Sequence, residues 1–321
     1  MSDYMTLYEN CMLCPRQCGV NRLQGELGFC NCGPEMRAAV ACLHKGEEPP
    51  ISGTKGSGTV FFSGCTLQCA SCQNCQLSHE LLGGTITPRL LSEIFMELER
   101  FGAANINLVT ATQWIPHILM ALQSAKNRGM NLPVVWNSSG YEAEETLELL
   151  NNFIDIYLPD LKTISPTFSK SFLGTGDYAK TAQHAIGIMA KSKPLQWEEE
   201  TLVRGVIVRH LVLPGHIAAS KKAIEWIHTA FSNSVIISLM SQYIPFLSET
   251  GKQKENINRS LTKKEYAQIE AFIETLDIEN GFFQALSTDD TWRPDFKKEN
   301  PFPSEYAVPV WHYRFGFVAK N

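Results

Sequence analysis

All ten cysteines of this 321-residue chain lie within its first 75 positions, and this distribution constrains the fold more than any other feature. Several are separated by only two or three residues, a spacing typical of metal or iron–sulfur ligands in a reducing compartment rather than of disulfides. Ten small buried apolar residues would not cluster in this way. The cysteines are Cys11, Cys14, Cys18, Cys30, Cys32, Cys42, Cys65, Cys69, Cys72 and Cys75.

Composition and charge narrow the class of protein. Hydrophobic residues make up 44% of the chain and charged residues 19%, which is ample for a buried core. Lys and Arg number 28 against 33 Asp and Glu, so the net charge is −5, and the sequence has no basic tract. This charge disfavours attraction to an anionic membrane and binding of nucleic acid, including binding through zinc ribbons. The sequence contains no apolar run near the roughly 18 residues of a membrane span, and the N-terminus lacks the pattern of an export signal. We therefore expect a cytoplasmic protein.

The chain divides into three zones. Residues 1–55 are rich in Cys and Gly and are expected to form a metal-binding extension, residues 56–250 alternate strand and helix patterns, and residues 251–321 are expected to pack on the central zone. Such alternation predicts a parallel sheet with right-handed crossovers, either an open doubly wound sheet or a partial barrel. The expected strands are Thr59–Ser63, Ile106–Thr110, Val134–Trp136, Ile154–Leu158, Val206–Leu213 and Val235–Met240; the expected helices are Leu90–Phe101, Ile115–Arg128, Ala143–Asn151, Tyr178–Lys191 and Ser220–Phe231.

The last zone has a pattern of its own. A polar stretch, Ser248–Arg259, predicts an exposed loop, and a charged helix over Thr262–Leu276 and an apolar run at Phe282–Leu286 follow it. From Thr291 onward, prolines among aromatics are typical of an extended segment wrapped over a domain surface.

The strongest motif follows the first expected strand. There Cys65, Cys69 and Cys72 form a C-x3-C-x2-C loop after a glycine. Three thiolates can hold three irons of a 4Fe–4S cluster and leave the fourth without a protein ligand, an open position that marks a catalytic centre. Cys75 would extend the loop to a closed four-cysteine site of ferredoxin or zinc type. The position of the loop at the C-terminal edge of a parallel sheet, where such folds bind ligands, favours the open cluster.

With this loop the chain resembles the radical S-adenosylmethionine (SAM) superfamily, although Ser71 stands where an aromatic residue usually precedes the third cysteine. The resemblance implies a partial parallel (β/α)6 barrel with a Cys-rich N-terminal extension and a wrapped C-terminal tail. It implies an oxidoreductase whose open iron chelates the amino and carboxylate groups of SAM. Reductive cleavage would then yield methionine and a 5′-deoxyadenosyl radical, with Cys65, Cys69 and Cys72 as the catalytic cysteines.

Within that superfamily the chain is most similar to pyruvate formate-lyase activating enzymes, from about Cys11 to Phe296. This similarity implies a glycyl radical enzyme or another protein as substrate and a flavodoxin- or ferredoxin-type reductant. Asp160-Leu161-Lys162 resembles a DLK motif, and Arg209 matches an arginine in a late strand, where alternation places His210 on the other face. The residues implied in cofactor binding are Thr110 and Thr112, at the place of a Gly-Gly-Glu motif, and Ser138, Ser139, Asp160, Lys162, Arg209 and Gln242.

The remaining cysteines predict a second centre. Cys11, Cys14, Cys18 and Cys30 give C-x2-C-x3-C-x11-C, a four-thiolate set suited to zinc or to an auxiliary iron–sulfur cluster. The pattern resembles the N-terminal extension of one branch of activating-enzyme-like proteins. The alternative to a radical enzyme is a non-catalytic electron-transfer or metal-binding protein with closed clusters, which would not cleave SAM.

Overall fold

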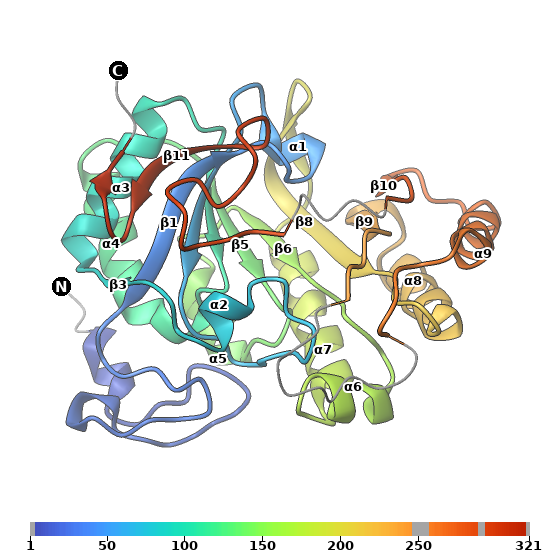
Figure 1. Ribbon diagram of the computed structural model, residues 1–321, viewed down its shortest axis with the longest axis horizontal. Helices are drawn as coiled ribbons and strands as arrows, with labels where there is room; N and C mark the ends of the chain where they lie inside the picture. Colours follow the sequence, from blue (N-terminus) through green and yellow to red (C-terminus); the bar gives the residue numbers. More distant parts are fainter. Residues whose placement is uncertain (1–3, 246–256, 288–292, 319–321) are drawn as a thin grey trace.

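A single curved sheet organises the molecule (Figure 1). The computed structural model describes residues 4–245, 257–287 and 293–318. Neighbouring strands follow the order β10-β9-β8-β6-β5-β4-β2-β1-β11-β12, and the sheet does not close on itself. The parallel strands are β2 (Ser57–Phe62), β4 (Ile106–Val109), β5 (Val134–Ser138), β6 (Ile156–Pro159), β8 (Thr201–Leu211), β9 (Ile236–Met240) and β10 (Gly281–Phe283).

Antiparallel strands extend the other edge of the sheet. β1 (Arg37–His44) pairs with β2 on one side and with β11 (Ala307–His312) on the other. β11 also pairs with β12 (Gly316–Phe317), and the short β3 (Gly84–Thr85) pairs with β1. The expected boundary at residue 55 therefore falls between two paired strands. The division into three zones remains a prediction, and the last part of the first zone is built into the sheet.

Amphipathic helices cover the outer face of the parallel strands. They are α3 (Pro88–Arg100), α4 (Ile115–Asn127), α5 (Glu144–Leu150), α7 (Tyr178–Ser192) and α8 (Ile217–Phe231). Local sequence determines where these helices begin. At the start of α3 the Thr87 hydroxyl accepts a hydrogen bond from the backbone N–H of Leu90. Pro88 occupies the first turn, where a backbone N–H has no partner within the helix, so proline loses no hydrogen bond there. At the other side of the sheet, α9 (Lys263–Ile273) begins with a reciprocal capping box between Thr262 and Glu265.

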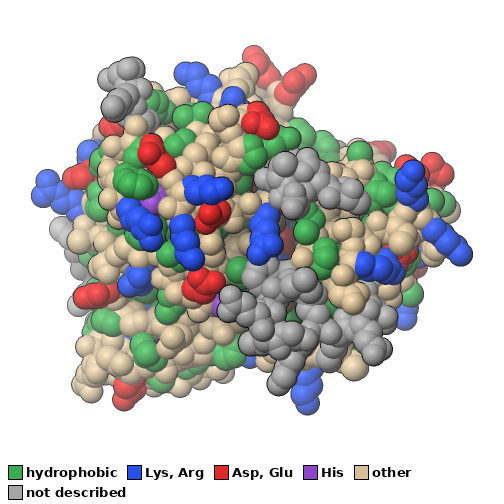
Figure 2. Space-filling model, viewed as in Figure 1, with side chains coloured by type: hydrophobic (Ala, Val, Ile, Leu, Met, Phe, Trp, Pro, Cys, Tyr) green, Lys and Arg blue, Asp and Glu red, His purple; other side chains and the backbone are tan. Residues whose placement is uncertain are grey.

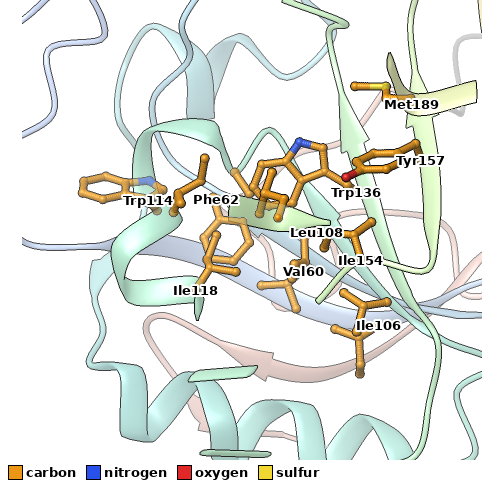
Figure 3. Close-up of a cluster of buried hydrophobic side chains, with 14 of the residues drawn as sticks. Val60, Phe62, Ile106, Leu108, Trp114, Ile118, Trp136, Ile154, Tyr157 and Met189 are labelled. Atoms are coloured by element: carbon orange, nitrogen blue, oxygen red, sulfur yellow. The ribbon is translucent and has the colours of Figure 1, made fainter. Parts of the chain in front are cut away.

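Side-chain alternation along the strands separates the core from the cavity. Val60 and Phe62 of β2 point toward the helices, together with Leu108 and Trp136 from neighbouring strands (Figure 3). Phe61, between them, faces the inner side and belongs to a different apolar cluster. This period of two is what a parallel sheet buried on both faces requires. The outer layer fixes the helices, and the inner layer is free to line a site.

The predicted open, mostly parallel α/β sheet is confirmed, and all six expected strands are present. Sequence reasoning missed β1, because its apolar run lies among the cysteines, and it missed α6 (Pro166–Phe172), although Ser165 and Pro166 are a usual helix start. It also missed the exposed strand β7 (Gln196–Glu198). The tail does not simply wrap over the surface, since β11 joins the sheet. Most of the expected loop Ser248–Arg259 lies outside the described residues.

Two surface properties bear on the class of protein. No helix among the described residues is long and apolar enough to cross a membrane. On the face drawn in Figure 2, basic and acidic side chains are interspersed rather than gathered by sign.

Candidate active site

A cavity of about 310 Å³ opens at the carboxyl ends of the parallel strands, on the inner side of the sheet. Its volume is at the lower end of what small-molecule sites occupy. Cys65, Cys69 and Cys72 all line it. They lie on the loop that leaves β2 and enters the short helix α2 (Cys75–Ser78), near the middle of Figure 1. Gly64, at φ +84°, makes the turn into this loop in a conformation that other residues rarely adopt.

The three sulfurs have surroundings suited to cluster ligands. The backbone N–H of Leu67 donates to Cys65 Sγ at 3.4 Å, and the Ser78 hydroxyl donates to Cys72 Sγ at 3.2 Å. Such hydrogen bonds to sulfur tune iron–sulfur centres. Among the described residues no three Cys, His, Asp or Glu side chains converge as a single metal ion requires. Each thiolate of a 4Fe–4S cluster binds a different iron, and three cysteines that line one cavity can hold three irons.

Burial dominates the acid–base behaviour of these thiols. It raises the pKa of Cys65 and Cys69 and raises that of Cys72 to about 11, while the ammonium of Lys162 acts in the opposite direction on all three. Metal thiolates are deprotonated, so loading the site releases these protons.

Cys75 differs from the three cavity cysteines. It is the first residue of α2, is 8% exposed, and is not among the residues that line the cavity. Its backbone carbonyl accepts from the N–H of His79, so it is held as part of a helical turn. The closed four-cysteine alternative would need this thiol to turn toward the cavity.

A charged network forms another part of the cavity wall. Asp160, directly after β6, accepts from Lys162 Nζ at 2.8 Å and from Arg209 Nε at 2.9 Å. Arg209 also donates through Nη2 to Asn137 Oδ1 at 2.5 Å. Burial alone would raise the pKa of Asp160, but Arg209 and Lys162 outweigh it and hold that pKa below its ordinary value. The result is a fixed anion between two cations, with all three side chains on the cavity.

Burial would lower the pKa of Lys162, but Asp160 and Cys69 raise it above its ordinary value, so the ammonium stays charged. The Tyr178 hydroxyl fixes this turn: it accepts from the Lys162 backbone N–H at 2.9 Å and lies 2.7 Å from the Asp160 carbonyl. His210 lies on the opposite face of β8 from Arg209, as alternation predicts. Its Nδ1 is 2.6 Å from the Leu161 carbonyl, in the core.

The structure brings together all but one of the residues implied in cofactor binding. Thr110, Ser138, Ser139, Asp160, Lys162, Arg209 and Gln242 all line the cavity. Thr112 does not: the 3-10 turn Thr112–Trp114 carries its side chain away, and its hydroxyl donates to Glu142 at 2.9 Å. Burial raises the pKa of Glu142 to about 7. The assignment of Thr112 to the cofactor is therefore corrected, and its role is to satisfy a buried carboxyl.

Sequence reasoning missed several cavity residues. Glu47 follows β1 and reaches the inner side of the sheet, where its Oε2 lies 3.8 Å from Arg209 Nη1. Its neighbour Glu48 is buried and accepts from the Ser238 hydroxyl at 3.0 Å. Burial raises the pKa of both carboxyls, and Arg209 offsets this only in part. No pattern in the sequence pairs residue 47 with residue 209; only the antiparallel β1 brings them together.

Tyr243 is a second residue that sequence reasoning missed. It follows β9, and its hydroxyl lies 3.0 Å from Ser71 Oγ and 2.8 Å from the Ile257 carbonyl. An aromatic side chain from the segment after β9 thus lies beside Ser71, in the loop that lacks the usual aromatic residue.

Comparison with known proteins agrees with this site. Residues 52–162, which include the cysteine loop and Asp160, match the family model of a 4Fe–4S single cluster domain. The uncharacterized protein MJ0674 of Methanocaldococcus jannaschii is 32% identical over 282 residues, which cover 85% of this chain and 76% of that protein.

Solved structures resemble the chain more distantly. Streptococcus suis SuiB bound to SAM has a TM-score of 0.46 at 8% identity, covering 69% of this chain and 48% of SuiB, so the chain spans about half of that protein. A domain of pyruvate formate-lyase-activating enzyme from Bacteroides vulgatus has a TM-score of 0.36 at 13% identity, covering 53% of this chain and 93% of the domain.

The matched cluster domain contains the open C-x3-C-x2-C loop, and the archaeal relative covers most of the fold that presents it. The chain therefore belongs to the family of the archaeal protein MJ0674, and its residues 52–162 match a 4Fe–4S single cluster domain.

Proposed function

We propose that this protein is a radical SAM enzyme with a 4Fe–4S cluster and SAM as cofactors, and that it activates a glycyl radical enzyme, or a related protein, by abstracting hydrogen from it. The observation that carries the proposal is the meeting of three cysteines and the Lys162–Asp160–Arg209 network in one cavity. When bound there, the reduced cluster supplies the electron that cleaves SAM. The similarity of the cysteine loop, of Asp160-Leu161-Lys162 and of Arg209 to activating enzymes supports a protein as the substrate.

Each cavity residue is assigned a role within this proposal. Cys65, Cys69 and Cys72 hold the cluster, and Cys75 does not. Lys162 pairs with the carboxylate of SAM, because its ammonium is charged and 29% of its side chain is exposed. Asp160 orders Lys162 and Arg209 rather than receiving the cofactor's amino group, since both cations already occupy its oxygens. Hydroxyls and carbonyls at Thr110, Ser138 and Ser139 are left for that amino group.

One glutamine side chain completes the proposed site. Gln242, two residues after the end of β9, is assigned to the cofactor from its place on the cavity wall. The ten free cysteines support a reducing cytoplasm as the working compartment.

Two measurements test the function. The protein is reconstituted anaerobically with iron and sulfide, reduced with dithionite and supplied with SAM; 5′-deoxyadenosine should form, and Cys69→Ala should abolish it. Addition of a candidate glycyl radical enzyme should then give the EPR doublet of a glycyl radical. A fully loaded protein that forms no 5′-deoxyadenosine would overturn the enzyme in favour of a closed-cluster electron carrier. Cleavage without any glycyl radical would overturn the proposed substrate only.

A further inference from the structure

The N-terminal cysteines surround a cavity of their own. Cys11, Cys14, Cys18 and Cys30 all line a small pocket of about 10 Å³. The segment that carries them has little regular secondary structure: between residues 4 and 36 the only helices are the 3-10 turns Tyr4–Tyr8 and Arg22–Gln24. A segment of this kind lacks the apolar core to fold alone, and bound metal would supply that stability.

A buried positive charge faces these thiols. Arg22 is 1% exposed and also lines the space. Its guanidinium donates to the carbonyls of Gln113, at 2.7 Å, and Gly33, at 2.6 Å, and it forms no ion pair with the residues that the structure describes. A buried cation held only by neutral carbonyls and ring faces is costly without a counter-charge. Four thiolates around a metal centre would provide that negative charge.

The sulfurs also have the local features of a cluster site. The backbone N–H of Phe29 donates to Cys18 Sγ at 3.4 Å, as Leu67 does to Cys65. Gly28 allows this approach, since a Cβ there would lie 2.9 Å from Cys18 Sγ. Three of the thiols fall within eight residues, as in the cavity loop.

Four thiolates that line one pocket can hold either a single zinc ion or an iron–sulfur cluster, and metal analysis separates the two.

The two cysteine sets lie on opposite sides of one loop. Thr66, the residue after Cys65, lines the N-terminal space, while Cys65 itself lines the large cavity. Arg16 donates from Nε to the Thr66 carbonyl at 3.0 Å and so fixes the N-terminal segment to the loop. Cys32 Sγ packs directly against Gly64, where a Cβ would overlap it. One stretch of backbone therefore separates the two centres.

We propose that Cys11, Cys14, Cys18 and Cys30 bind a second iron–sulfur cluster, and that the loop at Gly64–Thr66 is the path by which single electrons pass from it to the cluster of the large cavity. The electrons come from a low-potential flavodoxin- or ferredoxin-type donor, which is oxidised by one electron for each one transferred. The electron path rests on the proposed function of the large cavity; the second cluster does not.

Metal analysis with matched variants tests the cluster. Wild-type protein reconstituted anaerobically should bind about eight irons and eight sulfides per chain, and Cys14→Ser and Cys69→Ala should each lose about half. Cys42→Ala, in the core of β1, should retain all of them. After dithionite reduction, Cys69→Ala should keep the EPR signal of a reduced cluster. Bound zinc, four irons in the wild type, or a fully loaded Cys14→Ser protein would overturn the second cluster.

Two further readouts separate a redox centre from a structural one. Arg22→Gln should move the reduction potential of the cluster kept by Cys69→Ala to a more negative value, because a nearby positive charge favours the reduced state. An unchanged potential would contradict Arg22 as its counter-charge. In Cys14→Ser, reduction of the remaining cluster by a reduced flavodoxin should slow at least tenfold. An unchanged rate, with SAM cleavage by dithionite intact, would overturn the electron path and leave the proposed function standing.

Discussion

Lys162→Met gives the sharpest test of the cavity, because it removes the ammonium and keeps most of the aliphatic stem. The lost interaction is a charge-assisted hydrogen bond to the cofactor carboxylate, worth roughly 1.5–3 kcal/mol. At about 1.4 kcal/mol per factor of ten, the Kd for SAM should rise roughly tenfold to a little over a hundredfold. Isothermal titration calorimetry on the anaerobic, cluster-loaded protein measures this directly.

The same substitution should cost little stability. Asp160 keeps its bond to Arg209 at 2.9 Å, so no buried carboxylate is left unpaired. The Lys162–Asp160 pair is partly exposed, at 29% and 18%, and a pair of this kind contributes about 1 kcal/mol or less. The melting temperature should fall by about 3 °C at most. Lys180→Met, on the exposed side of α7, is the matched control and should change neither quantity. A Kd within twofold of wild type, or a large loss of melting temperature, would refute the assignment.

Three more predictions follow from named contacts. Replacing any one of the three cavity cysteines by Ala should abolish both the absorbance of their cluster and SAM cleavage, whereas Cys75→Ala should leave both unchanged. Loss of the cluster absorbance and of SAM cleavage in Cys75→Ala would favour the closed four-cysteine site. Burial lowers the pKa of His44 from 6.5 to about 4, so the folded protein should lose stability as pH falls from about 6.5 toward 4. In His44→Phe the difference in stability between pH 7 and pH 5, measured by denaturant titration, should be smaller. A Cβ at Gly58 would lie 2.5 Å from the Asn105 carbonyl oxygen, so Gly58→Ala should destabilise the folded protein by about 1–3 kcal/mol. Gly187, on α7, has open space around it, so Gly187→Ala should stabilise the folded protein by about 0.5–1 kcal/mol. Equal denaturant midpoints of unfolding for the two variants would contradict this description of the packing.

The parallel part of the fold was predictable because each strand is a buried apolar run between amphipathic helices. Val134–Trp136 and Ile106–Thr110, for example, recur within a residue or two as β5 and β4. The cysteine loop and Asp160 were found because they follow such strands directly, so placing the strand also places the residue. Local order in the chain was enough for these positions.

The missed elements depend on contacts between distant parts of the chain. β1 is held between β2 and β11, so its pairing partner on one side lies about 270 residues further along the sequence. Glu47 enters the cavity only because β1 runs antiparallel and returns the chain toward Arg209. The predicted cofactor contact of Thr112 has a different problem. Thr112 is close in sequence to the correct strand end, but a 3-10 turn directs its hydroxyl to Glu142. Proximity in sequence does not determine the direction of a side chain in a turn.

One side chain joins the parts of the site that sequence reasoning treated separately. Gln113 Nε2 lies within hydrogen-bonding distance of the carbonyls of Ser63, Gly64 and Thr110, so it ties the start of the cysteine loop to the end of β4. Its own backbone carbonyl accepts from Arg22, which faces the N-terminal thiols. The two cysteine sets therefore share one support, and the N-terminal segment contacts, through Arg22 and Gln113, the loop that carries Cys65, Cys69 and Cys72. A change at Arg22 should accordingly be felt at both centres, whereas a change at Lys162 should be confined to the cavity.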